Sequence, residues 1–143
     1  MPFNFLGHIA TADVAFEAWG ETREELFASA AAAFLRTMVE EPEAVERREE
    51  LSIHLEHEEL DLLLFSFLQE LVFFKDARRL LLHVDSVQIE EQEGLLKLAA
   101  VARGEEITPL RHHLLVDIKA ITLHKLEAVF ENRQWKATVV MDI

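Results

Sequence analysis

The chain has 143 residues, a formal net charge of −13 and no cysteine, and 50% of its residues are hydrophobic. This hydrophobic fraction excludes an intrinsically disordered chain, and the length predicts one domain over residues 1–143. The lack of cysteine excludes disulfides, thiolate metal sites and cysteine nucleophiles.

The acidic balance argues against direct binding of nucleic acid. A surface with a net charge of −13 repels phosphate groups, and the lysines and arginines are scattered without a basic stripe. No apolar run is long enough to span a membrane, and the N-terminus lacks the pattern of a signal peptide. We therefore expect a cytoplasmic protein with metal cations or basic protein surfaces as partners, and with no direct contact to nucleic acid or membrane.

The N-terminal part predicts two strands followed by a helix. Residues 3–7 are expected to form a short strand, and residues 14–19 alternate apolar and polar side chains as a second strand does. Thr22 and Glu25 have the spacing of a capping box, with Thr22 as the N-cap. Apolar residues then recur every three or four positions up to Met38, which predicts a helix.

The rest of the chain predicts a second helix within β-rich sequence. Residues 51–55 alternate as a strand, and residues 59–75 have helical apolar spacing. Further strands are expected over 80–89, 95–103, 116–130 with a bend, and 135–141. Hairpin turns are expected at 93–94 and 131–133. This order predicts an α+β domain with a mostly antiparallel sheet, two principal helices packed on it, and two β-helix-β stretches that suggest a duplicated motif.

Two carboxylates at remote positions are candidate metal ligands. Asp13 precedes a predicted strand and Asp142 ends the last one, so one sheet edge could bring them together. With the terminal oxygens of Ile143 they would form an all-oxygen site for Ca²⁺, Mg²⁺ or Mn²⁺. Ca²⁺ is the expected ion because it tolerates irregular geometry. The alternative is that Asp13 caps a turn and that Asp142 frays at the terminus.

Three further residues are candidates for the surroundings of this site or for partner contacts. His8 and His124 could orient the metal ligands through hydrogen bonds. Lys119 falls within an apolar strand pattern, and a buried lysine would need a carboxylate such as Asp13 or Asp142 as its partner.

Other histidines carry weaker signals. His54 and His57 lack the helical His-Glu-x-x-His spacing of metalloproteases, and on a strand they would face opposite sides. Residues 111–113, Arg-His-His, are expected in a loop, where they could contact a partner. No serine has the surroundings of a catalytic nucleophile, so the sequence does not support nucleophilic catalysis.

Several short motifs follow one another over essentially the whole chain. They are Thr11-Ala12-Asp13-Val14, Glu25-Leu26-Phe27, Asp61-Leu62-Leu63-Leu64, Gly104-Glu105, Ile118-Lys119-Ala120-Ile121-Thr122-Leu123-His124 and Met141-Asp142-Ile143. Together, in this order, they resemble the archease family. Two positions depart from the family pattern. Leu123 stands where a tyrosine is usual, and Thr108 stands where an acid is common, so a partner contact at either position would be altered.

The resemblance implies a function that composition does not. It implies a non-enzymatic activator of the RtcB-type RNA ligase, which seals RNA ends in tRNA splicing and RNA repair using GTP and Mn²⁺. The activator would promote guanylylation and multiple turnover of the ligase. Its metal ligands, by the same resemblance, would be Asp13, Asp142 and Ile143. The alternatives are a metal-dependent hydrolase on the same carboxylates, with His8 or His124 as general base, and a chaperone-like acidic domain.

Overall fold

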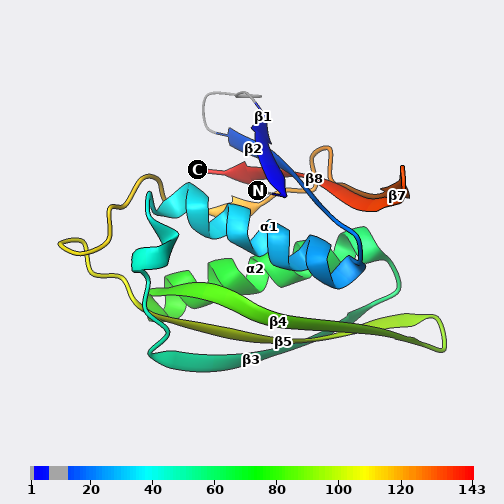
Figure 1. The fold of residues 1–143 in the computed structure, drawn as a ribbon, viewed down its shortest axis with the longest axis horizontal. Helices are drawn as coiled ribbons and strands as arrows, with labels where there is room; N and C mark the ends of the chain where they lie inside the picture. Colours follow the sequence, from blue (N-terminus) through cyan, green and yellow to red (C-terminus); the bar gives the residue numbers. More distant parts are fainter. Residues whose placement is uncertain (1, 7–12) are drawn as a thin grey trace.

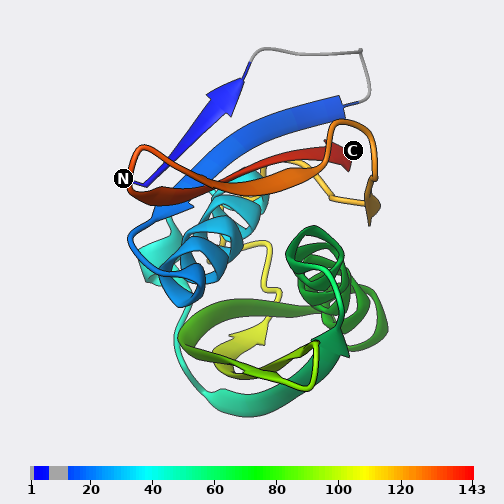
Figure 2. The same cartoon turned by 90° about the vertical axis from the view of Figure 1, so that its right-hand side faces the viewer.

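Two antiparallel sheets enclose two helices (Figure 1) in a computed structural model that describes residues 2–6 and 13–143. The predicted α+β class, with antiparallel pairing and two principal helices, is confirmed. The strands form two sheets rather than the expected one, and the helices lie between them (Figure 2). Each helix contacts both sheets, so the hydrophobic core surrounds the helices.

The first sheet contains strands from both ends of the chain. Its members are β1 (Phe3–Leu6), β2 (Asp13–Gly20), β6 (Ala120–Ile121), β7 (Glu127–Glu131) and β8 (Gln134–Asp142). β8 pairs with β2 on one side and with β6 and β7 on the other, while β1 pairs with β2. The end of β8 therefore lies between β2 and β6.

The second sheet has three strands in the order β3-β5-β4. They are β3 (Glu49–His57), β4 (Leu80–Gln92) and β5 (Leu95–Glu106). The predicted turn between β4 and β5 is confirmed, because Glu93 and Gly94 both have positive φ angles, 51° and 80°, as a two-residue hairpin loop requires.

The two β-helix-β stretches are not equivalent. β2 and β3 flank the first helix and belong to different sheets. β3 and β4 flank the second helix and share a sheet, in which β5 lies between them. The sheet connectivity thus does not reproduce the suggested duplication.

The helices are α1 (Arg23–Met38) and α2 (Leu60–Arg78). Thr22 caps α1 as predicted, since its Oγ1 accepts the Glu25 N–H at 3.1 Å. The Glu25 carboxylate accepts the N–H of Glu21 at 2.8 Å, whereas a capping box would use the N–H of the N-cap residue Thr22. Among the described helices, none is both long enough and apolar enough to cross the hydrocarbon layer of a membrane.

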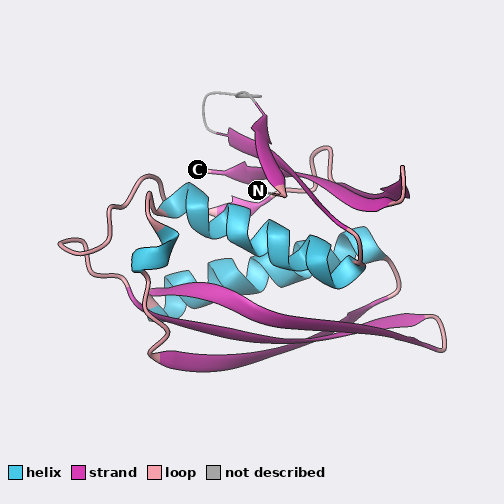
Figure 3. Ribbon diagram, in the orientation of Figure 1, coloured by secondary structure: helices cyan, strands magenta, loops and turns pink. Residues whose placement is uncertain are grey.

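A long loop, residues 107–119, joins β5 to β6 (Figure 3). The predicted strand over 116–130 is therefore wrong outside β6 and β7. Backbone N–H and C=O groups of this loop form hydrogen bonds outside the sheets. For example, the Leu115 N–H donates to the carbonyl of Met38 at the end of α1 over 2.8 Å. Contacts to α1 thus replace the pairing that a strand would have made.

Candidate metal centre

Asp13 and Asp142 lie directly opposite each other on neighbouring strands. Asp13 begins β2, Asp142 ends β8, and the antiparallel register pairs the two positions. Residues paired in this way project their side chains to the same face, with Cβ atoms about 5 Å apart. Strand pairing therefore brings together two carboxylates that are remote in sequence. Their role as metal ligands stays a prediction.

The neighbouring pair on the same face of the sheet is apolar. Ala15 and Val140 follow Asp13 and Asp142 in the register and are 0% and 1% exposed. Asp13 itself is half-buried, whereas Asp142 is exposed. One flank of the carboxylate pair thus excludes water, which strengthens any electrostatic interaction made there.

The C-terminal edge is held by contacts to the rest of the chain. The Lys119 N–H donates to the backbone carbonyl of Asp142 at 2.8 Å. The Gln69 side chain on α2 accepts the Ile121 N–H at 2.7 Å and so fixes β6 beside β8. Ile143 is half-buried and packs against the core. Ile143, next to Asp142 in the chain, is therefore an anchored residue.

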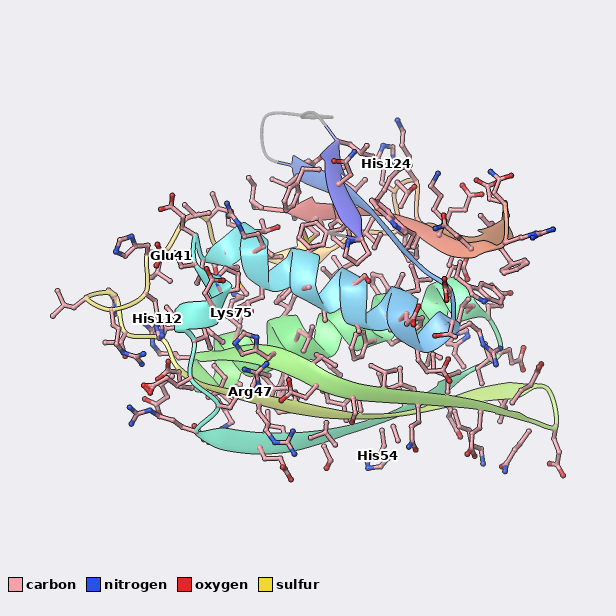
Figure 4. All side chains as sticks on the ribbon, viewed as in Figure 1. Glu41, Arg47, His54, Lys75, His112 and His124 are labelled. Carbon is pink, nitrogen blue, oxygen red and sulfur yellow. The ribbon has the colours of Figure 1, made fainter. Side chains whose placement is uncertain are left out.

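The other predicted site residues take different positions. The expected burial of Lys119 is wrong, because its side chain is exposed and only its backbone contacts Asp142. His124 is also exposed, in the turn after β6 (Figure 4), where its N–H donates to Thr122 Oγ1 at 3.2 Å. His8 lies outside the described residues.

The chemistry of the pair suits a hard cation. In residues 2–6 and 13–143, no group of three or more His, Cys, Asp or Glu side chains is arranged to hold a metal ion. Within that part of the chain, Asp13 and Asp142 would supply two side-chain ligands, and Ile143 its terminal oxygens. Such oxygen donors match Ca²⁺, Mg²⁺ or Mn²⁺, which complete their shells with water.

His54 and His57, on β3 of the second sheet, do not form a site with each other. His54 is exposed on β3 (Figure 4), and His57 lies three residues later on the opposite face. The Nδ1 of His57 accepts the Glu59 N–H at 3.1 Å, at the start of α2. The two side chains thus face opposite sides of the strand, as the sequence predicted.

Glu105 is the centre of a buried polar network that the sequence did not reveal. It is the penultimate residue of β5 and is 4% exposed. One carboxylate oxygen accepts the Glu46 N–H at 2.7 Å and contacts His112 Nε2 at 3.0 Å. The other oxygen pairs with the Arg111 guanidinium, and Arg48 Nε lies 3.5 Å from it. Two separate segments, residues 46–48 and 111–112, thus converge on one carboxylate.

The hydrogen bonds of His112 define its tautomer. The Thr108 N–H can only donate, and it lies 2.9 Å from His112 Nδ1, so that nitrogen is an acceptor. The proton of the neutral ring is therefore on Nε2, which donates to Glu105. Burial raises the pKa of Glu105, but hydrogen bonds from Arg111, Glu46 and His112 outweigh it and lower the pKa to about 2.

This network changes the interpretation of residues 111–113. Arg111 and His112 bind Glu105, and His112 is only 2% exposed, so the His112 side chain is not accessible to a partner. His113 is exposed and lies 3.9 Å from Glu40. The sequence signal was present in the Gly104-Glu105 motif, but only the fold shows what that glutamate binds.

A second buried charge lies under the same loop. Lys75 on α2 is 4% exposed and binds Asp117 at 2.7 Å and also Asp76. Burial lowers the pKa of Lys75, but the hydrogen bonds that its ammonium group donates to Asp117 and Asp76 outweigh this effect and leave the pKa raised. Lys75, and not Lys119, is thus the buried lysine that needs carboxylate partners.

Comparison with known proteins identifies the family of the chain. The model of the archease protein family (MTH1598/TM1083) matches residues 3–143. The chain belongs to the archease family. A relative named protein archease from Pyrococcus furiosus is 36% identical over 135 residues, which cover 93% of this chain and 94% of the relative.

Solved archease structures have the same fold. Protein 1598 of Methanobacterium thermoautotrophicum superposes with a TM-score of 0.86 at 34% identity, covering 99% of both chains. A Thermotoga maritima protein described as an archease and possible chaperone gives a TM-score of 0.60 at 22% identity, covering 94% of this chain and 93% of that one. The archease relatives cited are thus named as proteins or as a possible chaperone, and not as enzymes.

Proposed function

We propose that this archease is a metal-binding accessory protein that activates an RtcB-type RNA ligase in tRNA splicing and RNA repair. It would promote guanylylation of the ligase and its multiple turnover without joining RNA ends itself. The observation that carries the proposal is the register of Asp13 and Asp142, because it pairs the two carboxylates that the family resemblance singles out. The ligase partner rests on family membership.

The cation would be held by Asp13, Asp142 and the terminal carboxylate of Ile143. Like charges directly opposite on paired strands repel each other, and a divalent cation reverses that interaction. When bound, Ca²⁺ supplies positive charge and open coordination positions that water or a partner's oxygen atoms can occupy. The protein's own contribution is to fix the two carboxylates on rigid strands.

Activation through a protein contact agrees with the charge of the chain. The net charge of −13 makes direct recruitment of RNA unfavourable, so the effect on RNA joining would pass through the ligase. An activator shifts the ligase towards a competent state only if it binds that state more tightly than the inactive one. The carboxylate edge, with its cation, is the proposed contact that differs between the two states.

A ligation assay with limiting ligase tests this proposal. The wild-type protein should raise the number of RNA ends joined per ligase and the rate of guanylylation, whereas Asp13→Asn and Asp142→Asn should lose this effect while remaining folded. Glu17→Gln, on the same face of β2, is the matched control and should activate like the wild type.

Three outcomes would contradict the proposed function or the proposed site. If the wild-type protein leaves turnover and guanylylation unchanged with the ligase of its own organism, the ligase function is wrong. If both aspartate variants activate fully, the function stands but the carboxylate pair does not carry it. If the protein alone cleaves RNA in the presence of Mn²⁺, it is the metal-dependent hydrolase.

A further inference from the structure

The loop of residues 107–119 presents a cluster of apolar side chains to solvent. Leu110 is 99% exposed, Leu114 and Leu115 are 46% and 49% exposed, and Val116 is 39% exposed. We call these four residues the leucine surface. Single exposed apolar residues are ordinary, whereas four within seven positions of one loop, three of them lining one slot, are the kind of exposed apolar surface that marks interaction sites.

The backbone under the leucine surface is held in place. The carbonyl of His113 accepts the Glu40 N–H at 2.9 Å, and the Leu115 N–H donates to Met38 at 2.8 Å. Before these contacts, Arg111 and His112 bind the buried Glu105, as described above. After them, Ile118 is fully buried. The apolar side chains are therefore carried by an ordered backbone, which reduces the entropy lost on binding.

A small apolar slot lies beside the surface. It has a volume of about 140 Å³ and is lined by Leu114, Leu115 and Val116 together with residues of α1, α2, β4 and the loop. Lys75 and Asp117 form its polar part. A slot of this size accommodates one side chain of a partner, which is the form that anchoring contacts take in protein interfaces.

Negative charge borders the leucine surface. Asp76 and Asp117 share the ammonium group of Lys75, but their side chains are 59% and 67% exposed, whereas that of Lys75 is 4% exposed. The Glu40 side chain, beside His113, is 58% exposed. Arg111, the nearest arginine along the loop, is already paired with Glu105. The carboxylates of Glu40, Asp76 and Asp117 thus reach solvent beside Leu114, Leu115 and Val116, while Lys119 is exposed three residues further along the loop.

We propose that the leucine surface docks a protein partner that presents apolar side chains bordered by lysine or arginine. The acidic border favours such a partner and disfavours RNA. It also disfavours a second copy of this chain, because two surfaces of one sign would meet in a protein with a net charge of −13.

The partner is the ligase of the proposed function, on which this inference rests. The loop ends at Lys119, whose N–H donates to the backbone carbonyl of Asp142, so the loop that carries the leucine surface leads directly to the strand end that carries Asp142. Figure 1 shows the loop and the C-terminus towards the same end of the molecule. One partner can therefore contact the leucine surface and the carboxylate edge together.

Calorimetric titration of the full-length protein into the ligase, without RNA, tests the docking surface. The double variant Leu110→Ser/Leu115→Ser should raise the Kd at least about tenfold, and Glu40→Lys should raise it while reducing its salt dependence. The matched controls are Phe130→Ser, at a 57% exposed residue on β7, and Glu91→Lys, at an exposed residue on β4. Both controls should bind like the wild type.

Parallel measurements separate failure of the surface from failure of the function. Wild-type affinity in Leu110→Ser/Leu115→Ser, together with normal ligase activation, would overturn the docking surface and leave the proposed function intact. A wild-type protein that neither binds nor activates the ligase would overturn the function and, with it, the partner. Sedimentation that shows a wild-type dimer, lost in the double variant, would assign the surface to self-association and overturn the proposal. If the double variant unfolds, Leu110→Ser alone can replace it in the binding measurement. Leu110 is 99% exposed, so this single substitution should not destabilise the fold.

Discussion

His112 Nε2 lies 3.0 Å from Glu105 Oε2, and both residues are almost fully buried. This contact joins the end of β5 to the loop that leads to the C-terminal edge. The loop carries the leucine surface on its outer side and, at residue Lys119, binds the backbone of Asp142. Glu105 therefore supports, from inside the protein, the surface that we assign to partner binding.

The first prediction concerns the stability of this network. Glu105→Gln should lower the free energy of unfolding by about 1–3 kcal/mol at neutral pH, because the bonds from Arg111, His112 and the Glu46 N–H lose a charged acceptor. Urea denaturation measures the change. Glu106→Gln, at the exposed neighbouring residue, should stay within about 0.5 kcal/mol of the wild type. Equal effects of the two variants would contradict the role of Glu105.

The second prediction is the pH dependence of the same group. The pKa of Glu105 is lowered from 4.5 to about 2 in the folded protein, so the unfolded chain binds its proton first as the pH falls. The contribution of Glu105 to stability is thus complete above pH 4.5 and is lost between pH 4.5 and about 2. Unfolding curves of Glu105→Gln should fall less steeply in this window than those of the wild type. If the stability of Glu105→Gln and of the wild type falls equally steeply in this window, Glu105 is not the group responsible.

The third prediction concerns the carboxylate pair. Without metal, Asp142→Asn should raise the free energy of unfolding by about 0.2–1 kcal/mol, because it removes a like charge opposite Asp13. With Ca²⁺ in excess, the wild type should gain stability by mass action and the variant should not. Thermal unfolding with and without Ca²⁺, with Glu17→Gln as control, gives the comparison. If Ca²⁺ stabilises Asp142→Asn and the wild type equally, Asp142 is not a ligand of the cation and the proposed site is wrong.

The fourth prediction concerns backbone packing at Gly104. A Cβ atom at this position would lie 1.7 Å from the carbonyl oxygen of Leu81 on β4. Gly104→Ala should therefore destabilise the protein by roughly 3 kcal/mol or more, since backbone must move. Gly94→Ala is the control. It has open space but a φ of +80°, and should cost only about 1 kcal/mol. A near-neutral Gly104→Ala would show that β4 and β5 can separate without loss.

The fifth prediction concerns RNA. At a net charge of −13, the isolated protein should not shift tRNA in a gel at ~150 mM salt, where exposed charges are screened beyond about 8 Å. A basic nucleic-acid-binding domain in the same buffer serves as the positive control. Sub-micromolar binding by this protein would contradict activation through a protein partner.

The sequence was sufficient to predict the elements that depend on interactions between residues close together in the chain. The spacing of apolar residues predicted both helices, and the Thr22 cap forms as its spacing indicated. The turns at Glu93 and Asn132 were also predictable, because a two-residue hairpin loop needs residues that adopt positive φ. The carboxylate pair was partly predictable, since Asp13 and Asp142 stand at strand ends that one sheet can place together.

Tertiary contacts decided the rest. The apolar pattern of 116–119 is typical of a strand, but the loop backbone bonds to α1 and Ile118 is buried without a ladder partner. The same contacts expose Lys119 and bury Lys75, which two aspartates from different segments stabilise. Glu105 likewise acquires its donors from segments that meet only in the folded chain. Sequence patterns record which residues favour burial, whereas the pairing of buried charges depends on which segments the fold brings within hydrogen-bond distance.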